Sequence, residues 1–328
     1  MRFKLTVQCE LCPKMCLIEP GQSGECRVRI NIAGVLRSVV YGFPCSVSPY
    51  DRVEKKPLFH FLPGTTILSV ATVGCNLHCL NCQNWDISQT NPEESTAAFL
   101  PPERLVQLAK KHRFPSIAYT YSDPIIFYEY TYDSAKLARD KGIRNVLVTA
   151  GYINEEPWER LLEYVDAANI DLKFISDELY RRICSGTLKP VQNALILAKA
   201  SGILVEVTNL VIPTLNDKPE QIRELAGWIK ANLGGDTPLH FSGFHPQYKM
   251  KNLPPTSLQT LETAREIAIN EGLDYVYIGN VRSKEGENTY CPGCKGLLIE
   301  RTGYLIKQNR LKDGRCPDCK KEIYGVWK

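Results

Sequence analysis

The sequence of 328 residues has no apolar run that approaches the ~20 residues of a membrane-spanning helix. Its first residues carry a basic end but neither an apolar stretch nor a small-residue cleavage site, so no secretory signal is expected. The net charge is also small, because 40 Lys and Arg residues against 36 Asp and Glu residues leave only +4. That excess is too small to indicate nucleic acid or anionic lipid as a partner. These absences predict a soluble, cytoplasmic protein without a membrane partner.

The unusual feature that is present is a set of 13 cysteines. A disulfide framework predicts a short secreted chain, whereas pairs of thiols two residues apart suit one metal better than an unstrained disulfide. Three separate cysteine–metal sites are therefore predicted, and two lone cysteines are predicted to be buried small apolar residues. The three groups are Cys9, Cys12, Cys16 and Cys26; Cys75, Cys79 and Cys82; and Cys291, Cys294, Cys316 and Cys319, and the lone residues are Cys45 and Cys184.

Between about residues 66 and 280, short β-rich runs alternate with amphipathic helical segments. Such strand–helix units predict a parallel sheet with right-handed crossovers, and six or seven units fit an α/β fold of the full or partial (β/α) barrel type. An open Rossmann sheet is less favoured because no G-x-G-x-x-G follows the first strand. The predicted division is a four-cysteine metal unit at 1–62, the barrel at 63–284 and a zinc-ribbon-like unit at 285–328.

The central group, Cys75, Cys79 and Cys82, follows the first predicted barrel strand with the spacing Cys-x3-Cys-x2-Cys. The carboxyl ends of barrel strands are where catalytic sites are built. Three thiolates suit a [4Fe–4S] cluster whose fourth iron has no protein ligand. The alternative is a structural zinc with His78 as its fourth ligand.

The two outer groups have four thiols each. Cys291, Cys294, Cys316 and Cys319 form two Cys-x2-Cys knuckles, which predict one zinc ion, with rubredoxin-like iron as the alternative. Basic residues around these knuckles leave nucleic-acid or protein binding open. Cys9, Cys12, Cys16 and Cys26 predict either a zinc site or a second [4Fe–4S] cluster, with zinc slightly favoured.

The cysteine loop and its surroundings resemble the radical S-adenosylmethionine (SAM) superfamily, and within it the AmmeMemoRadiSam system enzymes, which are homologues of pyruvate formate-lyase activating enzyme. Matching stretches cover nearly the whole chain: C-x2-C-P-x2-C from Cys9, DRVEKKPLFHFLPG at 51–64, YTYSDP at 119–124, NIDLKF at 169–174 and TYCPGC at 289–294. The sequence departs from the family pattern at Asn81, where an aromatic residue is usual, and at Asp123, where glutamate is usual. Core packing is predicted for Trp85, with compensation for the aromatic residue missing at Asn81 as the alternative.

The resemblance implies the site residues and the chemistry. The fourth iron would chelate the amino and carboxylate groups of SAM, and reductive cleavage would yield a 5′-deoxyadenosyl radical that abstracts hydrogen. Tyr121, Ser122 and Asp123 match the Gly-Gly-Glu-Pro region that receives the methionine amino group. Asp171 and Lys173 match an Asp-Leu-Lys element near the cofactor, although a purely structural ion pair is the alternative. Ile212 is expected to face the adenine of SAM. His245 is expected to face the cofactor or the substrate.

The leading functional hypothesis is therefore a radical SAM oxidoreductase with an unidentified substrate. The alternatives are an activase of a glycyl radical enzyme and, from another class, a non-catalytic zinc or nucleic-acid-binding module. Expected partners are SAM and an electron donor such as flavodoxin or ferredoxin, while a protein substrate, a Memo-family partner or nucleic acid is left open. The substrate side of the pocket is predicted to include Glu54, Lys55, Lys56, His60, His245 and Lys249, if residues 51–64 close over the barrel mouth.

Overall fold

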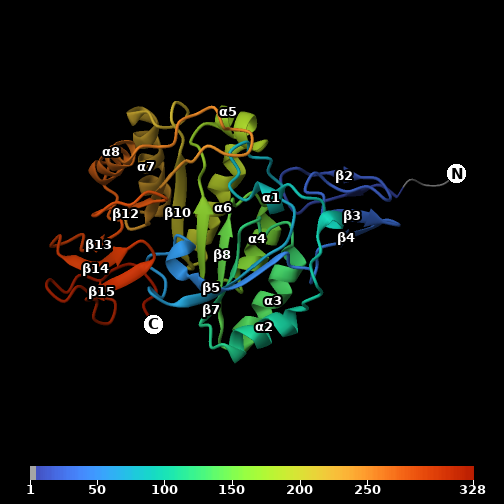
Figure 1. Ribbon diagram of the computed structural model, residues 1–328, viewed down its shortest axis with the longest axis horizontal. Helices are drawn as coiled ribbons and strands as arrows, with labels where there is room; N and C mark the ends of the chain where they lie inside the picture. The colour runs from blue at the N-terminus through green and yellow to red at the C-terminus, as the bar shows by residue number, and fades with distance from the viewer. Residues whose placement is uncertain (1–4) are drawn as a thin grey trace.

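The computed structural model describes residues 5–328. At its centre is an eight-stranded sheet in which every strand lies beside its neighbours in sequence, in the order β12-β11-β10-β9-β8-β7-β6-β5 (Figure 1). Strands β6 to β12 are parallel, and β5 pairs antiparallel with β6. The strands are β5 (Ser46–Arg52), β6 (Thr66–Ala71), β7 (Ser116–Tyr119), β8 (Arg144–Thr149), β9 (Ala167–Asp171), β10 (Leu204–Val211), β11 (Leu239–Gly243) and β12 (Val276–Gly279).

Amphipathic helices connect the parallel strands. A doubly wound sheet reverses its strand order at a switch point, whereas this order is sequential throughout, as in a (β/α) barrel. Within residues 5–328 the edge strands β5 and β12 do not pair with each other, so the barrel is partial. The predicted fold class is confirmed. The main connecting helices are α2 (Pro102–Lys111), α3 (Tyr128–Asp140), α4 (Glu155–Leu162), α6 (Leu188–Ala200), α7 (Pro219–Leu233) and α8 (Leu258–Asn270).

The segment that follows β5 forms the floor of the barrel. It begins with the 3-10 turn η1 (Val53–Lys55), and Phe61 then packs in an apolar cluster with Ala118 and Val146 from the strands. Glu206 on β10 accepts hydrogen bonds from the backbone N–H groups of Phe59 (3.1 Å) and His60 (2.8 Å). Although these residues belong to the stretch 1–62 of the predicted N-terminal unit, their contacts are with the barrel.

The C-terminal unit packs against β12 and the floor segment. It is a three-stranded antiparallel sheet whose buried side chains share an apolar cluster with Phe59 and with Tyr277 of β12. The buried Arg301 donates a hydrogen bond to the Phe59 carbonyl (2.8 Å), and its guanidinium carbon lies 4.2 Å from the centre of the Phe59 ring. The unit therefore joins the floor segment to β12. Its strands are β13 (Thr289–Tyr290), β14 (Leu297–Thr302) and β15 (Leu305–Asn309).

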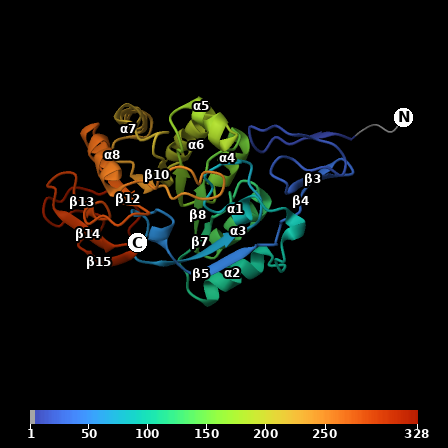
Figure 2. The same ribbon diagram turned by 45° about the horizontal axis from the view of Figure 1, so that its top comes forward.

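The N-terminal unit lies at the opposite end of the molecule from the C-terminal unit (Figures 1 and 2). It consists of two small hairpins, which pair β1 (Val7–Gln8) with β2 (Leu17–Ile18) and β3 (Arg29–Ile32) with β4 (Val35–Ser38). The remaining short helical segments are α1 (Trp85–Ser88), η2 (Pro92–Glu94), α5 (Asp177–Leu179) and the π-helical turn η3 (Tyr180–Cys184). Among the described residues, no helix is long and apolar enough to cross a membrane.

Candidate active site at the carboxyl ends of the strands

A cavity of about 380 Å³ lies at the carboxyl ends of the barrel strands. The loops that follow successive parallel strands meet there, which is how this fold brings distant segments of the chain together. All three central cysteines and six of the seven predicted SAM contacts line this cavity: Cys75, Cys79 and Cys82, together with Tyr121, Ser122, Asp123, Asp171, Lys173 and Ile212.

The cysteine loop is held in place by backbone contacts. Gly74, just before Cys75, has a φ of +97°, and a Cβ at this position would lie 2.5 Å from a methyl group of Val28, so both conformation and space require glycine. Two backbone hydrogen bonds fasten the loop to η3, from the N–H of His78 to the carbonyl of Cys184 (3.0 Å) and from Leu80 to Ile183 (2.9 Å). These contacts fix the position of the loop relative to η3.

The electrostatics of the thiols depend on burial and on two neighbours. Burial raises the pKa of Cys75, whereas a hydrogen bond from Cys184 lowers the pKa of Cys79. Burial opposes the charge of Lys173, yet Asp171 and Cys79 together raise its pKa well above the usual value. The Lys173 ammonium lies 2.7 Å from a carboxylate oxygen of Asp171, so the ion pair considered from sequence is formed, and it is formed at the cavity wall.

Cys184 is buried as predicted, but its hydrogen bond to Cys79 makes it part of the site. Cys45, the other lone cysteine, is only half-buried.

Asp123 ties the end of β7 to the end of β8. Its carboxylate accepts hydrogen bonds from the Thr149 hydroxyl (2.8 Å) and from the N–H groups of Ala150 (2.8 Å) and Ile125 (3.1 Å). Burial nevertheless raises its pKa. Because α3 begins only at Tyr128, Asp123 does not cap that helix.

Next to Asp123, Tyr121 has a left-handed backbone, with φ of +67°. Its carbonyl accepts a hydrogen bond from the Asn84 side chain (2.9 Å), which connects this turn to the cysteine loop. Left-handed backbone is rare outside glycine and marks a position that the surrounding structure imposes.

Three sequence-predicted residues lie elsewhere. His245 is exposed, and its Nε2 lies 3.2 Å from the Asn280 carbonyl, so the turn after β11 carries its ring outside the cavity that Asn280 lines. His78 Nδ1 lies 3.0 Å from Oε1 of Gln89, and the ring does not line the cavity, which disfavours the zinc alternative. Trp85 is 45% exposed and stacks on Tyr248 with ring centres 5.4 Å apart, so the prediction that it packs in the core is wrong.

Residues 51–64 reach the cavity from the amino-terminal end of β6, so they form its floor and do not close over the barrel mouth. Lys55 and Lys56 line the cavity as predicted, whereas Glu54 and His60 are buried and do not line it. Both lysines contact Asp51, with N–O distances of 2.9 and 2.7 Å. Lys56 lies 4.1 Å from the centre of the Tyr121 ring, and burial lowers its pKa to about 8. The other two members of the predicted substrate side, His245 and Lys249, do not line the cavity either.

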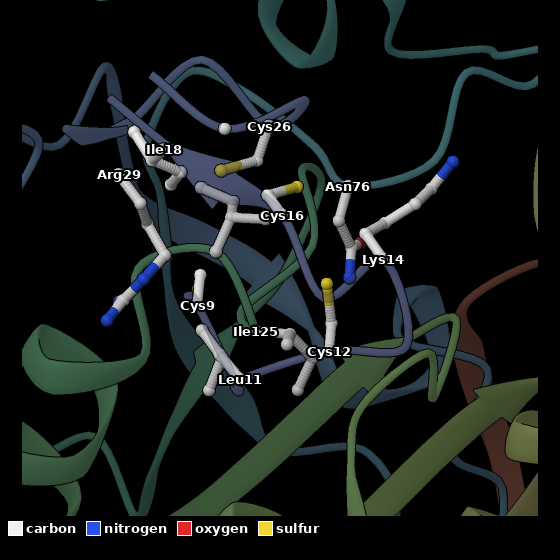
Figure 3. Close-up of a pocket in the computed structure, with 12 residues that line it drawn as sticks. Cys9, Leu11, Cys12, Lys14, Cys16, Ile18, Cys26, Arg29, Asn76 and Ile125 are labelled. Carbon is white, nitrogen blue, oxygen red and sulfur yellow. The ribbon is translucent and has the colours of Figure 1, made fainter. Parts of the chain in front are cut away.

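The two outer cysteine groups differ in geometry. Within residues 5–328 only Cys291, Cys294, Cys316 and Cys319 bring their sulfurs within 4.8 Å of one another, with Cys291 and Cys319 at 3.4 Å and Cys294 and Cys316 at 3.7 Å. Thiolates ~2.3 Å from one tetrahedral zinc would be about 3.8 Å apart. The C-terminal unit therefore has the geometry of a closed metal site. The four N-terminal cysteines instead line a separate small cavity (Figure 3).

The residues around the main cavity fit an iron–sulfur cluster with bound SAM. Two buried polar atoms at its wall, the Ser122 hydroxyl and Oδ1 of Asn81, have no hydrogen-bond partner within the described part of the chain. Buried polar groups are almost always satisfied, so these two indicate a ligand. Three cysteines on one loop also leave one iron of a cubane free for a non-protein ligand.

Comparisons with known proteins indicate the family of the chain. Residues 69–229 match the family model described as Radical SAM superfamily. The chain is 48% identical over 319 residues to the protein named Uncharacterized protein MJ0808 of Methanocaldococcus jannaschii, covering 97% of this chain and 95% of that one. It is 28% identical over 166 residues to the pyruvate formate-lyase-activating enzyme of Clostridium pasteurianum, covering 48% of this chain and 66% of that one.

Among solved structures, Streptococcus suis SuiB bound to precursor peptide SuiA has a similar fold, with a TM-score of 0.53 and 15% identity over 70% of this chain and 52% of that chain. A radical SAM methyltransferase from Sphaerobacter thermophilus gives a TM-score of 0.51 at 16% identity over 68% of each chain. The chain belongs to the radical SAM superfamily and has relatives that resemble activating enzymes.

Proposed function

We propose that this protein is a radical SAM enzyme that binds a [4Fe–4S] cluster through Cys75, Cys79 and Cys82 and abstracts hydrogen from its substrate. The observation that carries the proposal is the convergence of these cysteines and six further predicted residues on one cavity. When bound, the cluster and SAM would supply one-electron reductive cleavage of the sulfonium, and with it a 5′-deoxyadenosyl radical. This protein's own residues bind and orient those groups.

The wall of the cavity offers complementary charges to the methionine part of SAM. Lys173, kept protonated by Asp171, suits the carboxylate, and a charge-assisted hydrogen bond of this kind is among the stronger polar contacts in proteins. Ser122 and Tyr121, on the turn after β7, suit the amino group, with the unpaired Ser122 hydroxyl available as an acceptor. Asp123 acts through its bonds to Ala150 and Ile125, which keep that turn in place.

The floor of the cavity would face the substrate. Lys55, Asp51 and the Tyr121 hydroxyl form a polar group there, with the Lys55 ammonium 3.2 Å from the hydroxyl. Apolar residues such as Val148 and Ile212 also line the cavity. Such a mixed, recessed site keeps water away from a reactive radical, which the chemistry requires.

The direct test is anaerobic SAM cleavage. The full chain is reconstituted with iron and sulfide, reduced, and assayed for 5′-deoxyadenosine, with Cys79→Ala as the inactive variant and Cys45→Ala as the matched control. We expect product from wild type and Cys45→Ala but not from Cys79→Ala. Zinc at all three cysteine groups, with no sulfide and no product, would support the non-catalytic alternative and overturn the proposal.

A second candidate within the same chemistry is activation of a glycyl radical enzyme. It is supported by the relatives whose names describe them as pyruvate formate-lyase-activating enzymes, although they match 48% to 59% of this chain. Under this hypothesis the substrate is a backbone glycine of a partner protein. An adjacent glycyl radical enzyme gene, and a glycyl radical EPR signal when its product is mixed with this enzyme, would support it.

A further inference from the structure

The small cavity in the N-terminal unit lies outside the active site and is lined by four thiols. Cys9 and Cys16 begin and end the loop of the first hairpin, where the N–H of Cys9 donates to the Cys16 carbonyl (2.8 Å). Cys12 lies in the loop between them, and Cys26 enters from the next segment (Figure 3). Three of the four side chains are buried. Four thiols around one enclosed space form a complete ligand set for a metal centre.

The four N-terminal thiols stand further apart than the ligands of one zinc ion. Thiolates ~2.3 Å from a single tetrahedral zinc lie about 3.8 Å from one another. A cubane holds its thiolates at its corners, with iron and sulfide between them, so they stand further apart than thiolates on one ion. Within residues 5–328 only the C-terminal group has its four sulfurs within 4.8 Å.

Charge in the surroundings also suits a buried anionic centre. A [4Fe–4S] cluster with four thiolates carries net negative charge, which needs compensation in an apolar pocket. Arg29 lines the cavity and interacts with Cys9, while its guanidinium lies 2.8 Å from Glu129. Lys14 also lines the cavity, but its ammonium lies 2.7 Å from a carboxylate oxygen of Glu25 and points away from the sulfurs (Figure 3). Arg29 therefore places one cation beside the four thiols.

The cavity is in direct contact with the loop of the central cysteines. Asn76, the residue after Cys75, lines the cavity, and its side chain hydrogen-bonds the sulfur of Cys12 (Figure 3). On the other side of Cys75, a Cβ at Gly74 would lie 2.9 Å from the Cys26 carbonyl oxygen. A short covalent and hydrogen-bonded route, Cys12–Asn76–Cys75, therefore connects the two sets of thiols.

From this geometry we propose that Cys9, Cys12, Cys16 and Cys26 bind a second [4Fe–4S] cluster, in electronic contact with the cluster of the active site. One electron from a reduced ferredoxin- or flavodoxin-type donor would reduce this cluster and then pass to the three-cysteine cluster, with no bond made or broken. The relay rests on the proposed function, whereas the identity of the metal centre does not.

The test of the metal centre uses the Cys75→Ala/Cys79→Ala/Cys82→Ala variant of the full chain, which removes the central cluster without touching the N-terminal ligands. After anaerobic reconstitution we expect about four iron and four sulfide per chain, with about one zinc at the C-terminal site. Adding Cys12→Ala and Cys16→Ala should remove that iron, while adding Cys45→Ser should not. A triple variant that contains zinc without sulfide, or no iron, overturns the proposal even if the wild type cleaves SAM.

The relay is tested by EPR of the fully reduced wild type. Two reduced clusters in contact should broaden or split each other's signals relative to the summed spectra of the triple variant and of Cys12→Ala/Cys16→Ala. A wild-type spectrum equal to that sum would overturn the electronic contact. Because neither measurement depends on product, failure of SAM cleavage remains distinguishable from failure of this inference.

Discussion

The central loop and the C-terminal unit use the same amino acid in opposite ways. In the C-terminal unit four sulfurs approach within 4.8 Å of one another, and Cys291 and Cys316 are fully buried. The central loop offers three thiols to a cavity of about 380 Å³, with no fourth thiol from the same loop. One set is closed around its own centre, and the other is open towards the barrel.

Both the number of thiol ligands and the residues around them distinguish a closed metal site from one that can bind a cofactor. A closed site satisfies its metal and stabilises the fold around it, whereas an open coordination position is available to a cofactor. The C-terminal unit packs on Phe59 and Tyr277 and so fastens the floor segment to β12. The cysteine loop faces charged and unpaired polar groups that a ligand would satisfy.

The largest effect is expected from breaking the closed site. Cys316→Ala removes a buried ligand, so the C-terminal unit should lose its metal and the unfolding temperature should fall by on the order of 10 °C. Metal analysis and thermal unfolding provide the measurement, with Cys45→Ala as control. Cys82→Ala should abolish SAM cleavage while the C-terminal metal stays in place. An unchanged metal content in Cys316→Ala would show that the four sulfurs do not form one site.

A smaller effect is expected from the charge beside the open site. Lys173→Met removes the cation that pairs with Asp171, and loss of one charge-assisted hydrogen bond, worth ~1.5–3 kcal/mol, should weaken SAM binding about 10- to 100-fold. Anaerobic calorimetry on the reconstituted protein measures it. Lys249→Met is the matched control, because that ammonium lies 5.2 Å from the Tyr248 ring and outside the cavity. Equal losses in both variants would contradict a role for Lys173 at the cofactor.

Much of this site was predictable from the sequence because parallel strands bring their carboxyl ends to one edge. Once strand–helix alternation is recognised, Cys75, Asp123 and Lys173 must meet although they are far apart in the chain. The direction of a turn is not encoded in this way. His245 comes two residues after the end of β11, yet its ring lies outside the cavity, because position after a strand does not determine where the turn carries the side chain.

Contacts that depend on tertiary packing were also missed. Cys184 has no partner at ligand spacing, and only the folding of η3 against the cysteine loop places it beside Cys79. The sequence did not show from which end of the barrel Lys55 and Lys56 reach the cavity. Nearness in sequence to the first barrel strand does not distinguish the floor of the barrel from its mouth. The antiparallel pairing of β5 with β6 decides it, since η1 follows β5 at the amino-terminal end of β6.

The burial of Lys56 at the floor of the cavity predicts that the free energy of unfolding depends on pH. The pKa of Lys56 is about 8 in the folded protein because of burial, against ~10.5 when unfolded. Between these values the unfolded chain binds more protons, so Lys56 makes the fold more stable as pH rises, by at most ~1.4 kcal/mol per pH unit. Urea unfolding at pH 8 to 9.5 should show this slope in wild type and its loss in Lys56→Met.

Lys55→Met is the control for that slope. Burial opposes the charge of Lys55, but Asp51 and Tyr121 raise its pKa, so its contribution is constant below ~10.5 and is lost only as pH rises further. The two variants should therefore differ in slope between pH 8 and 9.5. Parallel curves for both would show that Lys56 is not held in a desolvated site.

The smallest effect is expected where the two regions meet, at Tyr304 in the turn between β14 and β15. This side chain belongs to the C-terminal unit but lines the cavity, and it is 47% exposed. Exposed side chains contribute little to stability, so Tyr304→Ala should keep its C-terminal metal and its unfolding temperature, and SAM cleavage without substrate should change by less than about twofold. If Tyr304→Ala instead abolished cleavage while the metal was retained, the C-terminal unit would be part of the reactive site, and its separation from the open cysteine loop would no longer hold.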